Sequence, residues 1–167
     1  ENADATSADM RGATLTSARF SGAGLSDARL QGIQATGADF RSANVRGANL
    51  QGALLVGANF ASADLTASRM EAADLSGANM TGAWLNESIL TGAIFNGANM
   101  TGAQLRNAMI QNASFKDVRF IDADLTGIQG AEFADFEGAC VSLSTSLPAT
   151  FTLPLCGTAT APAAIAS

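Results

Sequence analysis

Few residues of this chain have the chemistry that catalysis or metal binding requires. Its 167 residues include no histidine and no tyrosine, and they include two cysteines, Cys140 and Cys156. Histidine is the commonest general base, so its absence removes the usual activator of serine and threonine hydroxyls. Two cysteines without a histidine do not complete an ordinary zinc site. The sequence therefore predicts neither an enzyme nor a bound metal or cofactor.

The two cysteines flank a segment that contains two of the three prolines and several apolar residues. The simplest interpretation is a disulfide, which would contribute about 3 kcal/mol by loop closure. The alternative is a pair of buried thiols in a reducing cytosol. A disulfide would place the protein in an oxidising compartment, such as the periplasm or the thylakoid lumen. The start at Glu1 rather than Met is consistent with a processed chain.

Carboxylate pairs are the remaining candidates for acid–base chemistry. Asp64 and Asp124 are separated by 60 residues, and Asp117 and Asp122 by five. We interpret all four as solvated surface charges. Residues 6–125 hold nine basic and ten acidic side chains, so this stretch is near neutral and has no basic stripe for nucleic acid. No apolar run approaches the ~18 residues of a membrane span, and we expect no membrane insertion.

A five-residue repeat organises most of the chain. From residue 10 to residue 125, every fifth residue is Leu, Phe, Met, Ile or Val, with the single exception of Ala35. Alanine fills most slots two residues earlier, and glycine is common two residues later. This period builds no apolar stripe on an α-helix or on one face of a flat strand. It becomes coherent if the chain turns a corner in each repeat, so that both apolar residues point inward.

Units such as ADLTA, ANLQG, ANFAS and ADLSG resemble the motif of the pentapeptide-repeat family, commonly written A(D/N)LXX. The resemblance covers about three quarters of the chain. It implies an all-β fold, a right-handed quadrilateral β-helix with four repeats, or about 20 residues, in each coil. It implies no single function, because roles within the family are diverse.

A period of 20 residues predicts columns of like residues along the rod axis. About six coils at the ~4.8 Å spacing of strands would give a rod of roughly 29 Å. The expected structural core includes Phe20, Phe40, Phe60, Met80, Met100 and Phe120 in one column, and Phe95 and Phe115 in another.

The repeat loses its register near residues 127–132, where one residue is inserted, and then fades. We therefore expect a β-helix over residues 1–136. Residues 137–167 would form a small disulfide-linked C-terminal cap, irregular or briefly helical, and a loose tail after Gly157.

The slot just before each central apolar residue should point outward, and it is mostly polar. We expect a side-chain ladder through Asn59, Asn79 and Asn99, and an exposed ion pair between Arg19 and Asp39. Five outward slots depart from this rule because they hold large apolar residues. These five residues, called the apolar belt below, are Leu54, Trp84, Ile89, Ile94 and Met109.

The apolar belt is a candidate surface for protein contact, because exposed tryptophan is enriched at binding hot spots. Scattered surface residues are the first alternative. The second is a cap or tail that folds back over the belt. We interpret the chain as a non-enzymatic scaffold, a monomer or weak dimer, with an unidentified protein partner.

The resemblance also offers a second function, a DNA-mimicking topoisomerase inhibitor or protector. That role needs a strongly acidic surface, which the near-neutral repeat region disfavours. Cysteine-containing members of the family in the periplasm or thylakoid lumen are similar to this chain in their cysteine pair, and this likeness favours an oxidising compartment.

Overall fold

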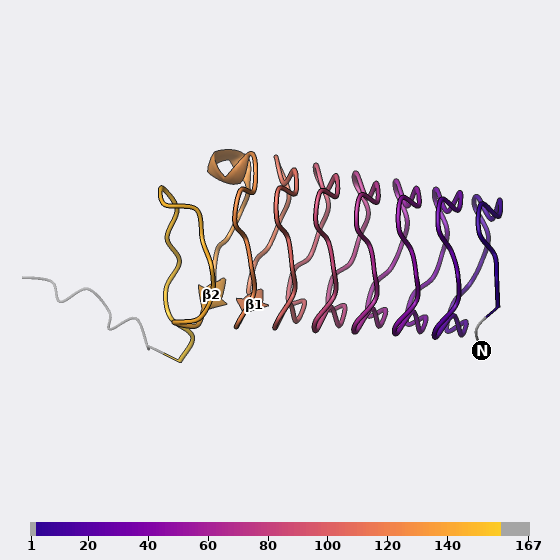
Figure 1. The fold of residues 1–167 in the computed structure, drawn as a ribbon, viewed down its shortest axis with the longest axis horizontal. Coiled ribbons are helices and arrows are strands. Elements are labelled where there is room, and N and C mark those ends of the chain that lie inside the picture. The colour runs from indigo at the N-terminus through magenta and orange to yellow at the C-terminus, as the bar shows by residue number, and fades with distance from the viewer. Residues whose placement is uncertain (1–2, 158–167) are drawn as a thin grey trace, which may run out of the picture.

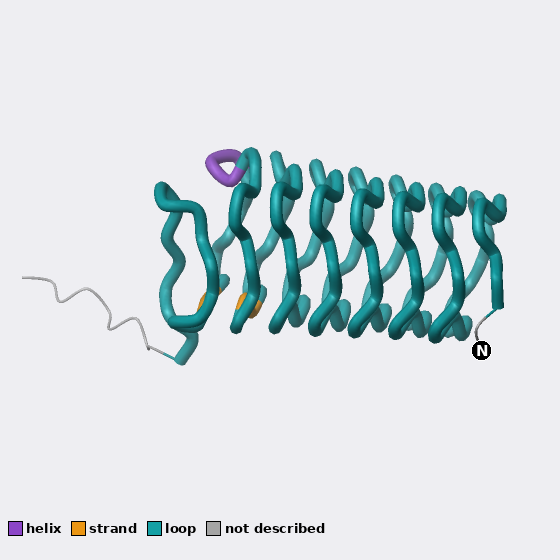
Figure 2. The backbone as a smooth tube through the Cα atoms, in the orientation of Figure 1, coloured by secondary structure: helices purple, strands orange, loops and turns teal. Residues whose placement is uncertain are grey.

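The structure is a computed structural model that describes residues 3–157. Short parallel β-bridges wind the chain into a straight rod, with the first and last described coils at opposite ends (Figure 1). Each residue of a bridge pairs with the residue 20 positions later, from Asp4 with Gly24 to Met109 with Gln129. Most of the backbone is therefore drawn as loop rather than strand (Figure 2). The named elements are β1 (Arg119–Phe120), the 3-10 helix η1 (Ala131–Phe133) and β2 (Cys140–Val141).

The bridges form four ladders, and each ladder gives the rod one outward face. We name each face after one of its residues. The Trp84 face holds Asp4, Gly24, Asn44, Asp64, Trp84, Gln104, Asp124 and Ser146. The Met109 face holds Asp9, Arg29, Asn49, Arg69, Ile89, Met109 and Gln129. The Ile94 face holds Thr14, Gln34, Leu54, Asp74, Ile94, Ser114 and Asp135. The Arg119 face holds Arg19, Asp39, Asn59, Asn79, Asn99, Arg119 and Cys140.

A tight turn at every corner joins one face to the next. In the first such turn the main-chain N–H of Ala8 donates to the carbonyl of Ala5 at 3.0 Å, and Ser7 between them has a φ of 57°. A positive φ at the third turn residue is the mark of a type II turn. The same position carries a positive φ in each repeat from Ser7 to Gly127. This geometry explains why glycine is common in that slot.

The interior contains the alanines and the large central residues. Phe20, Phe40 and Phe60 stack with ring centroids 5.0 and 4.6 Å apart, and Phe95 stacks on Phe115 at 5.1 Å. The other expected core residues, Met80, Met100 and Phe120, are fully buried. Phe20 is half-buried, because it belongs to the first coil and has a neighbouring coil on one side only.

The rod has more coils than the six expected. On the Trp84 face, seven successive pairings lead from Asp4 to Ser146. The estimate of six was wrong because the weak first repeat at Ala3–Asp4–Ala5 also pairs, and so does a displaced coil at the far end.

The expected register shift occurs between Gln129 and Asp135. Ser114 pairs with Asp135, which is 21 residues later, and β1 pairs with β2 at the same offset. The extra residue is accommodated by η1, which lies at the upper left of the rod in Figure 2. A second shift follows, because Asp124 pairs with Ser146. Helical structure in the described chain thus lies at the insertion and not in the cap.

The C-terminal cap is irregular and covers the end of the rod. Cys140 and Cys156 form the predicted disulfide, with an S–S distance of 2.05 Å. Beside β2, the N–H of Val141 donates to the carbonyl of Pro154, and the N–H of Cys156 donates to the carbonyl of Val141. Phe151 packs against Phe136 with centroids 4.8 Å apart. The tail after Gly157 lies outside the described residues.

Candidate protein-contact surface

The outward faces are dominated by polar side chains that interact with one another. Arg11 donates to Asp9 at 2.6 Å, and Arg41 donates to Asp39 at 2.7 Å. Further ion pairs join Arg69 to Glu71 at 2.8 Å, Arg106 to Asp124 at 2.5 Å and Lys116 to Glu137 at 2.8 Å. Opposite charges therefore lie side by side at these positions along the rod.

These pairs shift the ionisation of their members. The side-chain hydrogen bond from Arg11 lowers the pKa of Asp9 to about 2. The equivalent bond from Arg41 lowers the pKa of Asp39. Hydrogen bonds to Glu137 and then Asp135 raise the pKa of Lys116. All of these groups are charged at neutral pH, and each charge is matched locally.

The candidate acid–base pairs do not form. Asp64 lies 3.8 Å from Arg46, and Asp124 pairs with Arg106. The two aspartates are three ladder steps apart on the same face. Asp122 accepts hydrogen bonds from Ser142 and Ser144. Among residues 3–157 no group of three or more acidic, cysteine or histidine side chains could hold a metal ion.

Two expected polar interactions are replaced by local ones. Asp39 pairs with Arg41 in its own coil rather than with Arg19 in the coil before. Asn79 and Asn99 each accept the N–H of the residue two places on, at 3.1 Å, instead of forming a ladder with each other. The physical reason is shared: an Asx side chain reaches the free N–H of its own turn more easily than a neighbouring coil.

The apolar belt is spread over three faces of the rod. Trp84, Ile89 and Ile94 occupy successive faces of one coil, and Met109 pairs with Ile89 on the next coil. Leu54 lies two ladder steps from Ile94, with Asp74 between them. Trp84 is 50% exposed. Leu54, Ile94 and Met109 are also exposed, whereas Ile89 is half-buried. The structure thus brings Ile89 and Met109 together and leaves the other three apart.

Four exposed apolar residues were missed in the sequence: Val56, Phe133, Leu143 and Leu155. Phe133 belongs to η1 and shares a hollow with Met109, Gln111 and Gln129. It extends the apolar surface of the Met109 face toward the end of the rod. The register break at 127–132 was its available signal, because an inserted residue displaces side chains from the inward pattern.

Within the described chain, no helix combines the length and apolarity that crossing a bilayer demands.

Comparisons with known proteins agree with this architecture. The family model for pentapeptide repeats matches in eight copies, whose overlapping segments span residues 1–127. Proteins of this family form right-handed quadrilateral β-helices, in agreement with the four ladders. No match was found among curated protein sequences.

Three solved structures illustrate the similarity. Rfr23, a pentapeptide repeat protein from the cyanobacterium Cyanothece 51142, is 32% identical with a TM-score of 0.54, over 56% of this chain and 63% of its own. QnrB1, a plasmid-mediated fluoroquinolone resistance protein, is 22% identical with a TM-score of 0.50, over 85% and 79%. A pentapeptide repeat protein from the Arabidopsis thaliana thylakoid lumen is 25% identical with a TM-score of 0.35, over 78% and 62%. The chain thus spans less than two thirds of Rfr23.

Proposed function

Because the chain belongs to the pentapeptide-repeat family, we propose that it is a non-enzymatic structural scaffold whose apolar belt binds a partner protein. The observation that carries this proposal is the exposure of Trp84, Ile94 and Met109 in slots that are otherwise polar. Large apolar side chains that expose between a third and a half of their surface to water are stabilised when a partner covers them, at roughly 25 cal/mol per Å².

The position of the belt also supports a scaffold. Its residues project from parallel ladders that are continuous before and after them, so their spacing is fixed by the backbone. A surface that is already ordered loses little conformational entropy on binding. A monomer or weak dimer is the oligomeric state that we propose with this function.

The alternative of a DNA-mimicking topoisomerase inhibitor has less support. Seven of the fourteen acidic side chains in residues 3–157 form an ion pair with a basic one, as in the Asp9–Arg11 and Asp124–Arg106 pairs. A surface of neutralised pairs does not reproduce the continuous charge of a duplex. The match to QnrB1 concerns the fold alone.

We also propose that the protein works in an oxidising compartment, the periplasm or the thylakoid lumen. The Cys140–Cys156 disulfide supports this location, because disulfides are rare in reducing cytosol.

A retention experiment tests the belt. Immobilised wild-type protein is incubated with periplasmic or lumenal extract, beside a Trp84→Gln/Met109→Gln variant. Glutamine fits both slots, because Gln104 and Gln129 occupy the next ladder positions on the same two faces. We expect the variant to lose at least about tenfold of a retained protein, as for removal of a hot spot.

The matched control is Gln104→Asn/Gln129→Asn, which changes the same faces without touching the belt. Retention should be equal for this control and the wild type, and thermal unfolding should be unchanged in all three proteins. Equal retention by the Trp84→Gln/Met109→Gln variant, or no retained protein at all, would contradict the proposal.

A further inference from the structure

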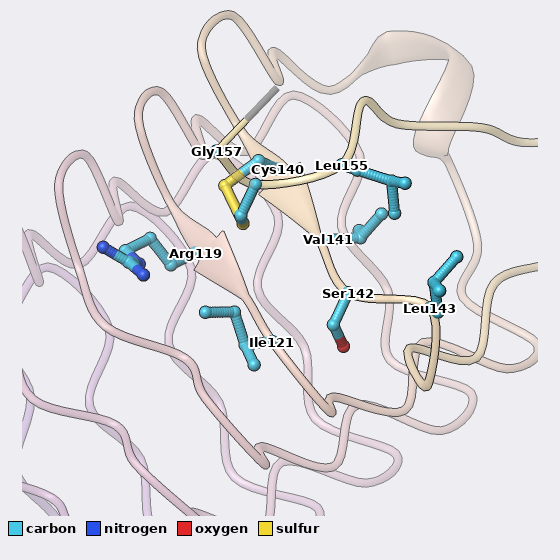
Figure 3. A pocket seen from close by; sticks show the side chains of 9 residues that line it. Arg119, Ile121, Cys140, Val141, Ser142, Leu143, Leu155 and Gly157 are labelled. Carbon is cyan, nitrogen blue, oxygen red and sulfur yellow. A yellow bond between two sulfur atoms is a disulfide. The ribbon is translucent and has the colours of Figure 1, made fainter. Parts of the chain in front are cut away.

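A second apolar site lies at the far end of the Arg119 face, away from the belt. It is an open hollow of about 480 Å³ lined by Arg119, Ile121, Val141, Leu143 and the Cys140–Cys156 disulfide, with Leu155 at its edge (Figure 3). In this view Arg119 and Leu143 lie at opposite ends of the hollow. Its volume falls within the range of ordinary ligand sites.

The hollow forms where the repeat gives way to the cap, because both the residue types and the ladder offset change there. Ile121 occupies a corner slot that holds Thr81 and Thr101 in the two preceding coils. Leu143 is 91% exposed, in the segment where the ladder offset grows from 21 to 22 residues. Two apolar side chains and a disulfide therefore replace the polar surface found along the rest of this face.

Arg119 supplies a charge that the rod itself does not neutralise. Seven of the nine basic side chains form ion pairs: Arg11, Arg29, Arg41, Arg46, Arg69, Arg106 and Lys116. Arg19 acts electrostatically on Asp39. Within residues 3–157 no carboxylate forms an ion pair with Arg119. Of the two acids nearest in sequence, Asp117 forms no ion pair in the described chain, and Asp122 is bound by Ser142 and Ser144.

We propose that this hollow binds a peptide segment in which an apolar side chain adjoins a carboxylate, as at an apolar C-terminus of a partner protein. The apolar side chain would contact Ile121 and Leu143. The carboxylate would pair with the guanidinium of Arg119, which has donors in a fork that matches a carboxylate. Leu143 is almost fully open to solvent, which suits a single side chain better than a long acyl chain.

The test uses a defined probe and nuclear magnetic resonance. Acetyl-Ala-Leu-Phe with a free carboxylate is titrated into the full chain and compared with the same peptide as its C-terminal amide. We expect shifts in the methyl signals of Ile121 and Leu143 and in the Nε–H of Arg119. The amide should bind about fivefold more weakly, as expected for loss of one ion pair.

The variant Arg119→Gln should remove the preference for the free acid, and Leu143→Ser should weaken both peptides. Arg19→Gln is the matched control, because it occupies the same type of slot on the same face at the other end of the rod. Equal binding of acid and amide, an equal effect of Arg19→Gln, or no methyl shifts would overturn the proposal. Tighter binding of decanoate than of the peptide would also overturn it. The belt shares no residue with the hollow, so each proposal can fail alone.

Discussion

Two serines occupy the alanine slot, and they differ in whether the buried hydroxyl forms a hydrogen bond. Ser68 and Ser88 are fully buried and stand one coil apart. The hydroxyl of Ser88 donates to the carbonyl of Leu85 at 2.7 Å. The hydroxyl of Ser68 is buried and has no hydrogen-bond partner among residues 3–157. A buried hydroxyl that forms no hydrogen bond loses its hydration without compensation.

We predict that Ser68→Ala raises the free energy of unfolding by about 1 kcal/mol, because it removes an unsatisfied polar group from a slot that alanine fills elsewhere. Ser88→Ala is the matched comparison, and it should be neutral or slightly destabilising because it removes a hydrogen bond that is made. Denaturant unfolding of both variants measures the difference. A larger gain from Ser88→Ala than from Ser68→Ala would contradict this reading.

At the scale of single residues, the sequence predicts well which side chains point inward or outward. It predicts poorly which polar side chains pair with one another. The five-residue period alone placed Phe40 inside and Trp84 outside. It did not predict that Asp39 pairs with Arg41 rather than Arg19, because that choice depends on side-chain reach across one turn. Phe133 was missed because it lies in the insertion, where the period no longer applies.

The corner turn is the element that the sequence describes incompletely. Glycine indicated a positive φ, yet twelve non-glycine residues, including Ala67 and Ala72, adopt the same conformation. Each such residue has a backbone cost that glycine avoids. The repeated hydrogen bonds between coils impose the turn on these residues, so the fold overrides local preference.

The cap is attached to the last coil by a small hydrogen-bond cluster. Asp122 accepts from the hydroxyls of Ser144 and Ser142, and these two hydrogen bonds lower its pKa below the ordinary 3.8. The hydroxyl of Thr145 donates to the carbonyl of Phe120 at 2.6 Å. These contacts hold residues 142–145 against β1.

We predict that acid loosens this attachment. Because the pKa of Asp122 is lower in the folded than in the unfolded protein, its contribution is complete above about pH 4 and is lost as the pH falls through the folded pKa. Amide hydrogen exchange at residues 142–146, corrected for intrinsic exchange rates, should therefore accelerate as the pH falls below about 4. Asp122→Asn should weaken protection at neutral pH and remove most of the acid dependence. The same pH dependence in the variant would show that another group is responsible.

At the scale of the whole molecule, each coil contacts mainly its neighbours, so stability should accumulate along the rod and the ends should open first. The disulfide fixes one of these ends by joining Cys156 to Cys140 of β2. The fold class could be read from the repeat. The coil count could not, because the first and last coils pair although their sequences depart from the motif.

We predict that Cys140→Ser/Cys156→Ser lowers the local stability of residues 141–157 by about 3 kcal/mol, as loop-closure entropy implies. Protection of the middle coils, for example around Phe60, should stay unchanged because those coils keep both neighbours. Site-resolved hydrogen exchange of the variant and the wild type gives both values. A uniform loss along the rod would show that the molecule unfolds as one cooperative unit.

Because each residue pairs with the one 20 positions later, the length of the rod and the angular orientation of its distal surface can be changed separately. Twenty residues inserted in register would lengthen it by about 4.8 Å and leave every distal side chain facing the same way. Five residues removed upstream would keep each inward residue inward but rotate the distal surface by one face. Trp84 would then take the slot of Asn79, in line with Arg19 and Asp39, and the hollow would turn with it. Spacer length and angular orientation can thus be engineered independently in this chain.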